Sequence, residues 1–254
     1  MPISIDVRTN APMLLAGLND LQRRKLPLIT AMALTTTAKL VEDAERREIR
    51  RVFDRPVDWT LNSLYTRPAT RGDLRAWVGF KDWASKGTPA GRYLRYHIDG
   101  GPREHTGFEM AMRRAGVLPN DRYAVPTSRL RLDGHGNVPK GLHTKVLSDL
   151  GASSDPTQNR NPGKKSRGRL RHLKFFAIST PTKDRGSVMA PGIYLQVGAS
   201  TMHQILMWAF VRQPTYRKRF DWPGIAQRTI DTGFAKAFRQ ARDQIGWGFD
   251  RKAA

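Results

Sequence analysis

The chain contains no cysteine, and this absence removes several kinds of chemistry at once. Disulfide bonds, thiolate zinc sites and thiol nucleophiles all need a sulfhydryl group, so none of them is available to it. The fold must therefore depend on the packing of its side chains.

Long apolar segments are also missing. No run approaches the roughly 18 apolar residues that identify a membrane-spanning helix. The N-terminal stretch lacks the order of basic, apolar and small residues that marks a secretory signal. We therefore expect a soluble protein, made in a cytoplasm, with no membrane partner.

Acidic residues are scarce relative to basic ones. The 254 residues include 44 Lys and Arg but only 22 Asp and Glu, which gives a formal net charge of +22. Such an excess predicts an acidic partner without saying which kind. The hydrophobic fraction of 39% is enough for a core, so we expect one large domain or two small ones.

The spacing of apolar residues predicts an α+β fold. One long amphipathic helix is expected from about Pro27 to Phe53 and a second from about Trp222 to Ile245. Both should pack on an antiparallel sheet, because each has one apolar face to bury.

Four short apolar runs are expected to form this sheet: "LRAWVGF", "FFAIS", "IYLQVG" and "ILMWAFV". The first should form a hairpin with "LYTRPAT", in which Pro68 suits an edge strand. Alternation along "LRAWVGF" places Trp77 on one face of the strand and Val78 on the other.

Residues 84–170 differ from the rest of the chain. Gly, Pro and charged residues surround short helical patterns at "AGRYLRYHI", "TGFEMAMRRAG" and "KGLHTKVLSDLG". This composition predicts an inserted subdomain, mostly helix and loop, with little core of its own. The core domain would then comprise residues 1–83 and 171–254.

The end of this insertion is strongly basic. The stretch "NRNPGKKSRGRLRHLKFF", residues 159–176, contains no acidic residue and ends in two phenylalanines. Its Pro, Gly, Asn and Ser content predicts an exposed loop. The candidate residues for binding a nucleic acid or an acidic protein are Arg160, Lys164, Lys165, Arg167, Arg169 and Arg171.

Motifs of known active sites are not found, so the chain is predicted not to be an enzyme and to use no metal or cofactor. His135, Asn137 and His143 have a spacing that also occurs in metal-dependent nucleases. However, Asp133, Gly136 and Asn137 equally suit a tight turn, and this is the favoured interpretation.

The tryptophans allow two interpretations. Lying among basic residues, they offer rings on which nucleic-acid bases stack, although packing in the core is the commoner role of a tryptophan. Trp208 lies within the apolar run "ILMWAFV" and is expected to be core. The full set is Trp59, Trp77, Trp83, Trp208, Trp222 and Trp247.

Residues spread over nearly the whole chain follow a recognisable order. They begin in "VFDRPVDWTLNSLYTRPATRGDLRAWVGFKD", continue through "KGTPAGRYL" and "AGVLP", and end before the last predicted helix. In this order the sequence resembles tailed-bacteriophage proteins of the minor tail protein Z type, also called tail-completion or neck proteins. The matching positions are Phe53, Arg55, Pro56, Thr60, Leu64, Pro68, Ala69, Thr70, Leu74, Ala76, Val78, Gly100, Gly101, Asp133, Gly136, Asn137, Gly192, Ile193, Pro214, Tyr216, Arg217 and Phe220.

This resemblance implies a structural role in the virion, in tail completion, head-tail joining or another part of the neck or tail. It implies assembly in the host cytoplasm and contact with other copies of the chain in a ring. Neighbouring phage head-tail or tail proteins are further expected partners. The matching positions within residues 84–170 are similar to the longer branch of these proteins. The segment has no counterpart in the shorter lambda-type proteins, so the exact position of the chain in the particle stays open.

Two interpretations of the basic stretch remain open. It binds the phosphates of packaged DNA without reading sequence, or it binds an acidic neighbouring virion protein. A rival function for the whole chain is that of a DNA-binding protein without sequence specificity, acting in packaging or regulation.

Overall fold

The computed structural model of the chain describes residues 21–81, 83–84, 87–160, 173–184, 187–197 and 203–246. The chain divides into two compact units. The first comprises Met1–Ile98 with Arg219–Ala254, and the second comprises Asp99–Lys218. The chain therefore passes twice from one unit to the other.

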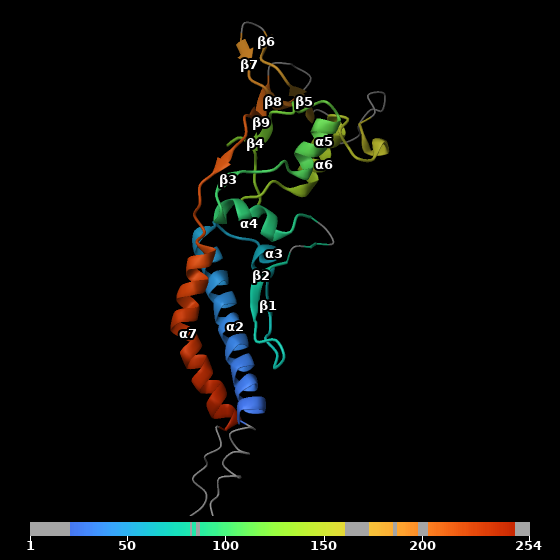
Figure 1. Cartoon of the computed structure of the whole chain (residues 1–254). Helices are drawn as coiled ribbons and strands as arrows, with labels where there is room; N and C mark the ends of the chain where they lie inside the picture. Colours follow the sequence, from blue (N-terminus) through green and yellow to red (C-terminus); the bar gives the residue numbers. More distant parts are fainter. Residues whose placement is uncertain are drawn as a thin grey trace, which may run out of the picture. The chain divides into compact units, whose positions relative to one another are not determined.

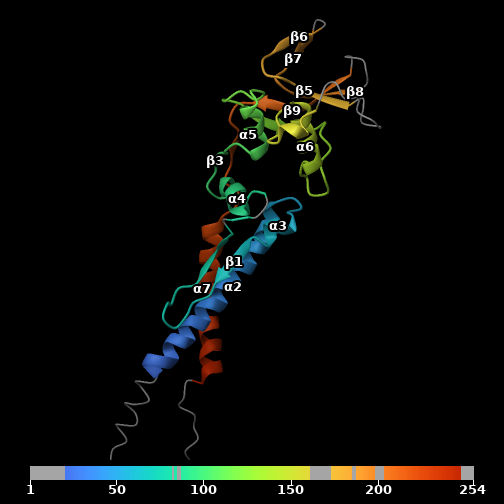
Figure 2. The same cartoon turned by 90° about the vertical axis from the view of Figure 1, so that its right-hand side faces the viewer.

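Two long helices, α2 (Leu26–Val52) and α7 (Trp222–Ile245), dominate the first unit. They pack against each other along their length: they lie side by side in Figure 1 and cross in the view of Figure 2. Ile29 and Ala33 of α2 form one buried cluster with Ala237 and Ala241 of α7. The alanines leave room for the two helix backbones to approach closely. The π-helical turn η1 (Leu21–Lys25) precedes α2, and a proline opens each long helix, where its missing N–H costs no hydrogen bond.

A β-hairpin packs against this helix pair. Strands β1 (Leu64–Arg67) and β2 (Trp77–Phe80) are antiparallel and contact α2. The buried Leu64 belongs to a cluster with Ile49 of α2, Phe220 and Ile225. The short helices α3 (Asp58–Leu61) and α4 (Ala90–Ile98) complete the unit.

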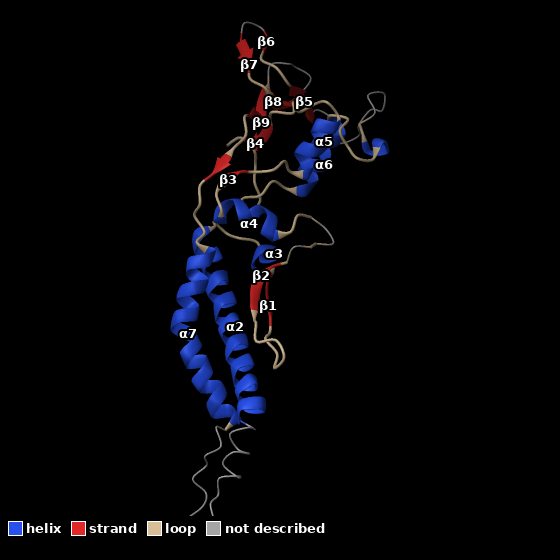
Figure 3. Ribbon diagram, in the orientation of Figure 1, coloured by secondary structure: helices blue, strands red, loops and turns tan. Residues whose placement is uncertain are grey.

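The second unit is built on a four-stranded antiparallel sheet with strand order β4-β9-β8-β5 (Figure 3). Its strands are β4 (Tyr123–Pro126), β5 (Leu173–Ile178), β8 (Gly192–Val197) and β9 (Gln204–Val211). Two small pairs accompany it: β3 (Gly101–Pro102) with β10 (Thr215–Tyr216), and β6 (Thr182–Asp184) with β7 (Ser187–Met189).

Helices α5 (Gly107–Arg114) and α6 (Lys140–Asp149) contribute to the core of this unit, and a short 3-10 turn, η2 (Pro156–Gln158), follows them. Met112 of α5 and Val146 of α6 are fully buried in one cluster with Trp208 of the sheet. Segments on both sides of the basic stretch therefore build one core.

A buried ion pair connects α5 with the sheet. The carboxylate of Glu109, 1% exposed, accepts hydrogen bonds from both terminal nitrogens of Arg103 at 2.6 Å. It also accepts the backbone N–H groups of Thr106 and Ala124, each at 2.7 Å. Burial alone would raise the pKa of Glu109, but these hydrogen bonds hold it below its usual range.

The α+β class, the antiparallel strands and the two long helices are confirmed. The three short helical patterns within residues 84–170 are confirmed as α4, α5 and α6. The prediction of one sheet shared by four apolar runs is wrong. Strand β2 pairs with β1 in the first unit, whereas β5, β8 and β9 pair with one another and with β4 in the second.

The predicted domain boundaries, residues 1–83 with 171–254 and residues 84–170, differ from the observed units because β5, β8 and β9 belong to the second unit. Residues 84–170 were expected to have little core of their own, and Met112, Leu118 and Val146 are buried in a core that they share with the sheet. These side chains need β5, β8 and β9 to cover them. The second unit therefore extends from Asp99 to Lys218.

Candidate functional site

Arg160, the first of the predicted binding residues, pairs with a carboxylate of its own chain. Its Nη1 lies 3.4 Å from Oδ1 of Asp149, whose side chain is 4% exposed at the end of α6. The Arg160 backbone N–H also donates to the carbonyl of Ser148 at 2.9 Å. Arg160 therefore anchors the basic stretch to α6, which limits its capacity to bind a partner.

Asp149 also holds residues near the end of the basic stretch. Its Oδ2 accepts the backbone N–H of Phe175 at 3.1 Å and pairs with Nζ of Lys145 at 2.8 Å. The same Nζ lies 3.4 Å from the carbonyl oxygen of Leu173. One buried carboxylate thus joins residues near both ends of the basic stretch to α6.

The five other predicted residues, Lys164, Lys165, Arg167, Arg169 and Arg171, lie outside the described residues. Their role in binding remains a prediction from the sequence. The described residues before and after these five, Arg160 and Leu173 to Phe175, are held to α6 by the contacts given above.

We expect Asp149→Asn to destabilise the protein by about 1–3 kcal/mol, because an amide cannot replace a buried carboxylate that accepts from Lys145, Arg160 and a backbone N–H. Urea unfolding of the full chain measures this loss. Asp121→Asn is the matched control, since Asp121 is exposed beside Arg122 and should change stability little. Equal effects of the two substitutions would contradict the anchoring role.

Residues 133–143 support the turn interpretation. Oδ1 of Asp133 accepts the backbone N–H groups of His135 and Asn137, both at 2.9 Å, so its side chain stabilises the turn. His143 instead packs against the rings of Phe108 and Trp208, and its burial lowers its pKa. Within the described part of the chain, no group of three or more His, Cys, Asp or Glu side chains is placed to hold a metal ion.

The tryptophans differ in burial, and Trp222 is partly buried against the cluster that contains Leu64 and Phe220. Trp208 is buried, as predicted, whereas Trp59, Trp77 and Trp83 are exposed. Trp247 lies outside the described residues. Trp77 lies on the outer face of the hairpin, and the alternation predicted for "LRAWVGF" therefore holds at Trp77 and Val78.

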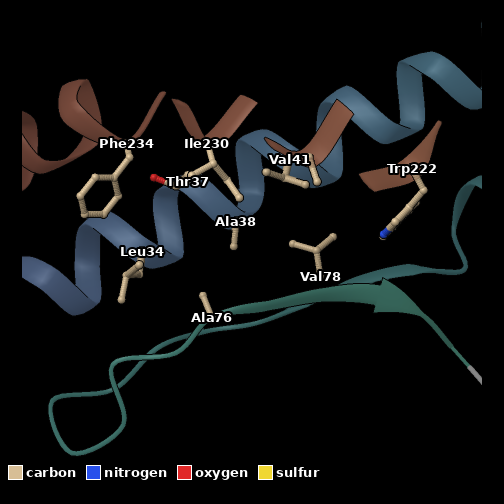
Figure 4. A pocket seen from close by; sticks show the side chains of 10 residues that line it. Leu34, Thr37, Ala38, Val41, Ala76, Val78, Trp222, Ile230 and Phe234 are labelled. Carbon is tan, nitrogen blue, oxygen red and sulfur yellow. The ribbon is translucent and has the colours of Figure 1, made fainter. Parts of the chain in front are cut away.

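The opposite face of β2 borders an apolar groove of about 230 Å³ (Figure 4). Leu34 of α2, Val78 of β2, and Ile230 and Phe234 of α7 are among the side chains that line it. The hydroxyl of Thr37, which also lines it, already donates to the carbonyl of Ala33 at 2.8 Å. The groove therefore suits an apolar group better than a charged one.

Glu45 is a buried acid on α2, one turn beyond Val41. It is 0% exposed, and among the described residues neither carboxyl oxygen has a hydrogen-bond partner. Burial raises its pKa to about 8; the nearby carboxylates of Glu48 and Asp221 add to this, and Arg228 opposes it. The carboxyl group is therefore expected to stay protonated at neutral pH.

The sequence analysis did not identify Glu45 or Asp149. For Glu45 a signal existed, because Val41, Glu45 and Ile49 follow one another at helical spacing and both neighbours are apolar. For Asp149 the sequence shows only the pairing with Lys145 four residues earlier on the same helix. Its other partners, Arg160 and the backbone of Phe175, lie 11 and 26 residues further along the chain, and no local spacing points to them.

No match is found to any model of a protein family, to any curated protein or to any solved structure. Within the described ranges, no helix is both long and apolar enough to cross a membrane.

Proposed function

We propose that the chain is a structural subunit of a tailed-phage particle, located at the neck or tail and acting in tail completion or head-tail joining. The proposal rests on the order of matching residues, three of which pack together in the core of the first unit. The rings of Phe53 and Phe220, both matching positions, pack edge to face with their centroids 6.0 Å apart. Leu64, another, is buried in the same cluster as Phe220.

Its partners are further copies of the chain in a ring and neighbouring head-tail or tail proteins, and it reaches the virion after assembly in the host cytoplasm. Cyclic symmetry would repeat each basic residue around the ring. With a net charge of +22, such a ring would present a strongly cationic surface either to packaged DNA or to an acidic virion protein.

Mass spectrometry of gradient-purified particles, produced from the genome that encodes the chain, tests this proposal. Peptides of the chain should be present at several copies per particle and should remain after a high-salt wash. Their absence from particles, with the protein present in the lysate, would overturn it.

The alternative is a free DNA-binding protein without sequence specificity, acting in packaging or regulation. Its sign would be tight DNA binding by the isolated monomer that weakens steeply as salt is raised, combined with absence from the particle.

Changing Lys164, Lys165, Arg167, Arg169 and Arg171 to serine should lower particle assembly or infectivity but barely change thermal unfolding. Substitutions at exposed positions usually change stability by less than about 0.5 kcal/mol each. Arg160 is left intact in this variant, because it pairs with Asp149.

Thermal unfolding of the isolated variant and complementation of a null mutant are the two measurements for this prediction. A variant that melts early would show that the charges pair within the chain. Unchanged assembly with normal stability would remove the basic stretch from the function.

A further inference from the structure

The outer face of the β1–β2 hairpin carries two exposed aromatic rings. Tyr65 lies opposite Gly79 in the strand register, and Trp77 lies opposite Arg67. All four residues share one face, because side chains alternate along each strand. Tyr65 is 44% exposed and Trp77 is 55% exposed.

Gly79 lets the Tyr65 ring lie against the sheet. A Cβ atom at Gly79 would be 3.6 Å from Cε1 of Tyr65 and 3.9 Å from its hydroxyl oxygen, so the ring extends over the glycine backbone. One side of the ring rests on the strand, and the exposed fraction of the side chain leaves the other side to solvent. Tyr65 and Trp77 are diagonal neighbours on the two strands. The Cα atoms of such a diagonal pair usually lie roughly 7–8 Å apart.

Cations flank these rings. Residues 64–81 include Arg67, Arg71, Arg75 and Lys81, against a single acidic residue, Asp73. The Asp73 carboxylate is paired with Nε of Arg75 at 2.7 Å. The face therefore combines two exposed rings with an excess of positive charge.

We propose that this face binds single-stranded nucleic acid, with bases stacked on Trp77 and Tyr65 and backbone phosphates near Arg67 and the flanking cations. Exposed aromatic rings beside basic side chains bind single strands without sequence preference, since every base offers a flat face to an aromatic ring. In a duplex the bases are stacked on one another, so few base faces are free to stack on Trp77 and Tyr65.

An acidic protein is the competing ligand for such a face. Protein anchors usually fill well-packed pockets at the centre of an interface. Here the apolar groove lies against the other face of β2, at Val78 and at Ala76 just before the strand, while Trp77 and Tyr65 stand on the outer face. The observations favour stacking. This site depends only on the hairpin, so it can be tested independently of the proposed place of the chain in a particle.

The test is fluorescence anisotropy with a labelled oligothymidine of about 15 nucleotides, a length within the range that single-strand sites cover. The full chain carrying the five serines at 164, 165, 167, 169 and 171 is compared with the same chain carrying Trp77→Leu or Trp77→Phe. Leucine keeps an apolar side chain but removes the ring, whereas phenylalanine keeps a ring. Trp83→Leu, at another exposed tryptophan, is the matched control.

We expect Trp77→Leu to weaken binding about tenfold or more, and Trp77→Phe and Trp83→Leu to weaken it less than about threefold, in line with the usual loss of one base–aromatic stack. A duplex of the same length should bind more weakly than the single strand. Tyr65→Leu is the second variant if Trp77→Leu proves unfolded by circular dichroism.

Equal binding by the leucine and phenylalanine variants would overturn the proposal, and so would a duplex that binds as tightly as the single strand. Displacement of the oligonucleotide by polyglutamate at matched charge would assign the face to acidic polypeptides instead.

Discussion

Replacing Glu109 with alanine should lower the free energy of unfolding by about 3–5 kcal/mol, the usual cost of removing one partner from a buried ion pair. The substitution leaves the Arg103 guanidinium, itself largely buried, without its counter-charge. It also leaves the backbone N–H groups of Thr106 and Ala124 without their acceptor. Each of these losses has the same sign.

Guanidinium chloride unfolding of the full chain, followed by tryptophan fluorescence, measures this effect. Trp208, buried in the same unit, reports on it directly. Asp54→Asn serves as the control, because Asp54 and its partner Arg55 are both well exposed and such pairs contribute little. A loss for Glu109→Ala no larger than that for Asp54→Asn would show that this network does not hold the unit together.

Replacing Glu45 with glutamine should stabilise the protein more and more as the pH rises. In the folded chain the pKa of Glu45 is raised to about 8 from a usual value of 4.5. Between these values the folded protein keeps a proton that the unfolded chain has released, so the stability of the wild-type protein falls as the pH rises. Glutamine mimics the protonated acid and removes this dependence.

The sign and size of the effect follow from the same pKa values. Below about pH 4.5 the Glu45 contribution is fully retained, and it is lost as the pH rises towards about 8. Each pH unit between the two pKa values corresponds to about 1.4 kcal/mol, so the variant should gain at most about 5 kcal/mol between these limits. Any fixed cost of burying the amide is the same at every pH.

Denaturant unfolding of both proteins from about pH 5 to pH 9 tests this, because the difference between them cancels the other titrating groups. Val146→Ala, in α6 of the second unit, is the control: it removes no titrating group, so its difference from wild type should stay close to constant with pH. A difference between Glu45→Gln and wild type that does not change with pH would mean that the Glu45 carboxyl is solvated or paired in the folded protein.

The sequence was sufficient to predict the two long helices. The expected span Trp222 to Ile245 matches α7, and α2 covers Leu26–Val52 against an expected Pro27 to Phe53. Their apolar stripes are long and regular, and Pro27 and Pro56 mark where α2 begins and where it cannot continue. These signals are local, so they can be read from the sequence without knowledge of the rest of the fold.

Strand partners were not predictable in the same way. An apolar run shows that a strand is buried but not which sheet contains it. Strand β4, Tyr123–Pro126, is too short to stand out in the sequence. It nevertheless pairs with β9 and so forms one sheet with β9, β8 and β5 in the second unit. The helices α5 and α6 then bury Met112 and Val146 against that sheet, which local composition does not reveal.

The candidate sites show the same limit. Basic charge pointed to Arg160, but its pairing with Asp149 depends on how residues 149–160 turn back on α6. Alternation placed Trp77 on its own face of β2, whereas the ring of Tyr65 over Gly79 depends on the strand register. The local sequence pattern predicts which face of a strand or helix a residue occupies. It does not predict which residue of another element that residue contacts.

Immunogold labelling of intact particles with an antibody against the chain tests the proposed function most directly. We expect gold at the head-tail junction or along the tail of particles, in several copies, with little label on heads. Particles that carry no gold, while the same antibody detects the protein free in the lysate, would contradict a structural role in the virion.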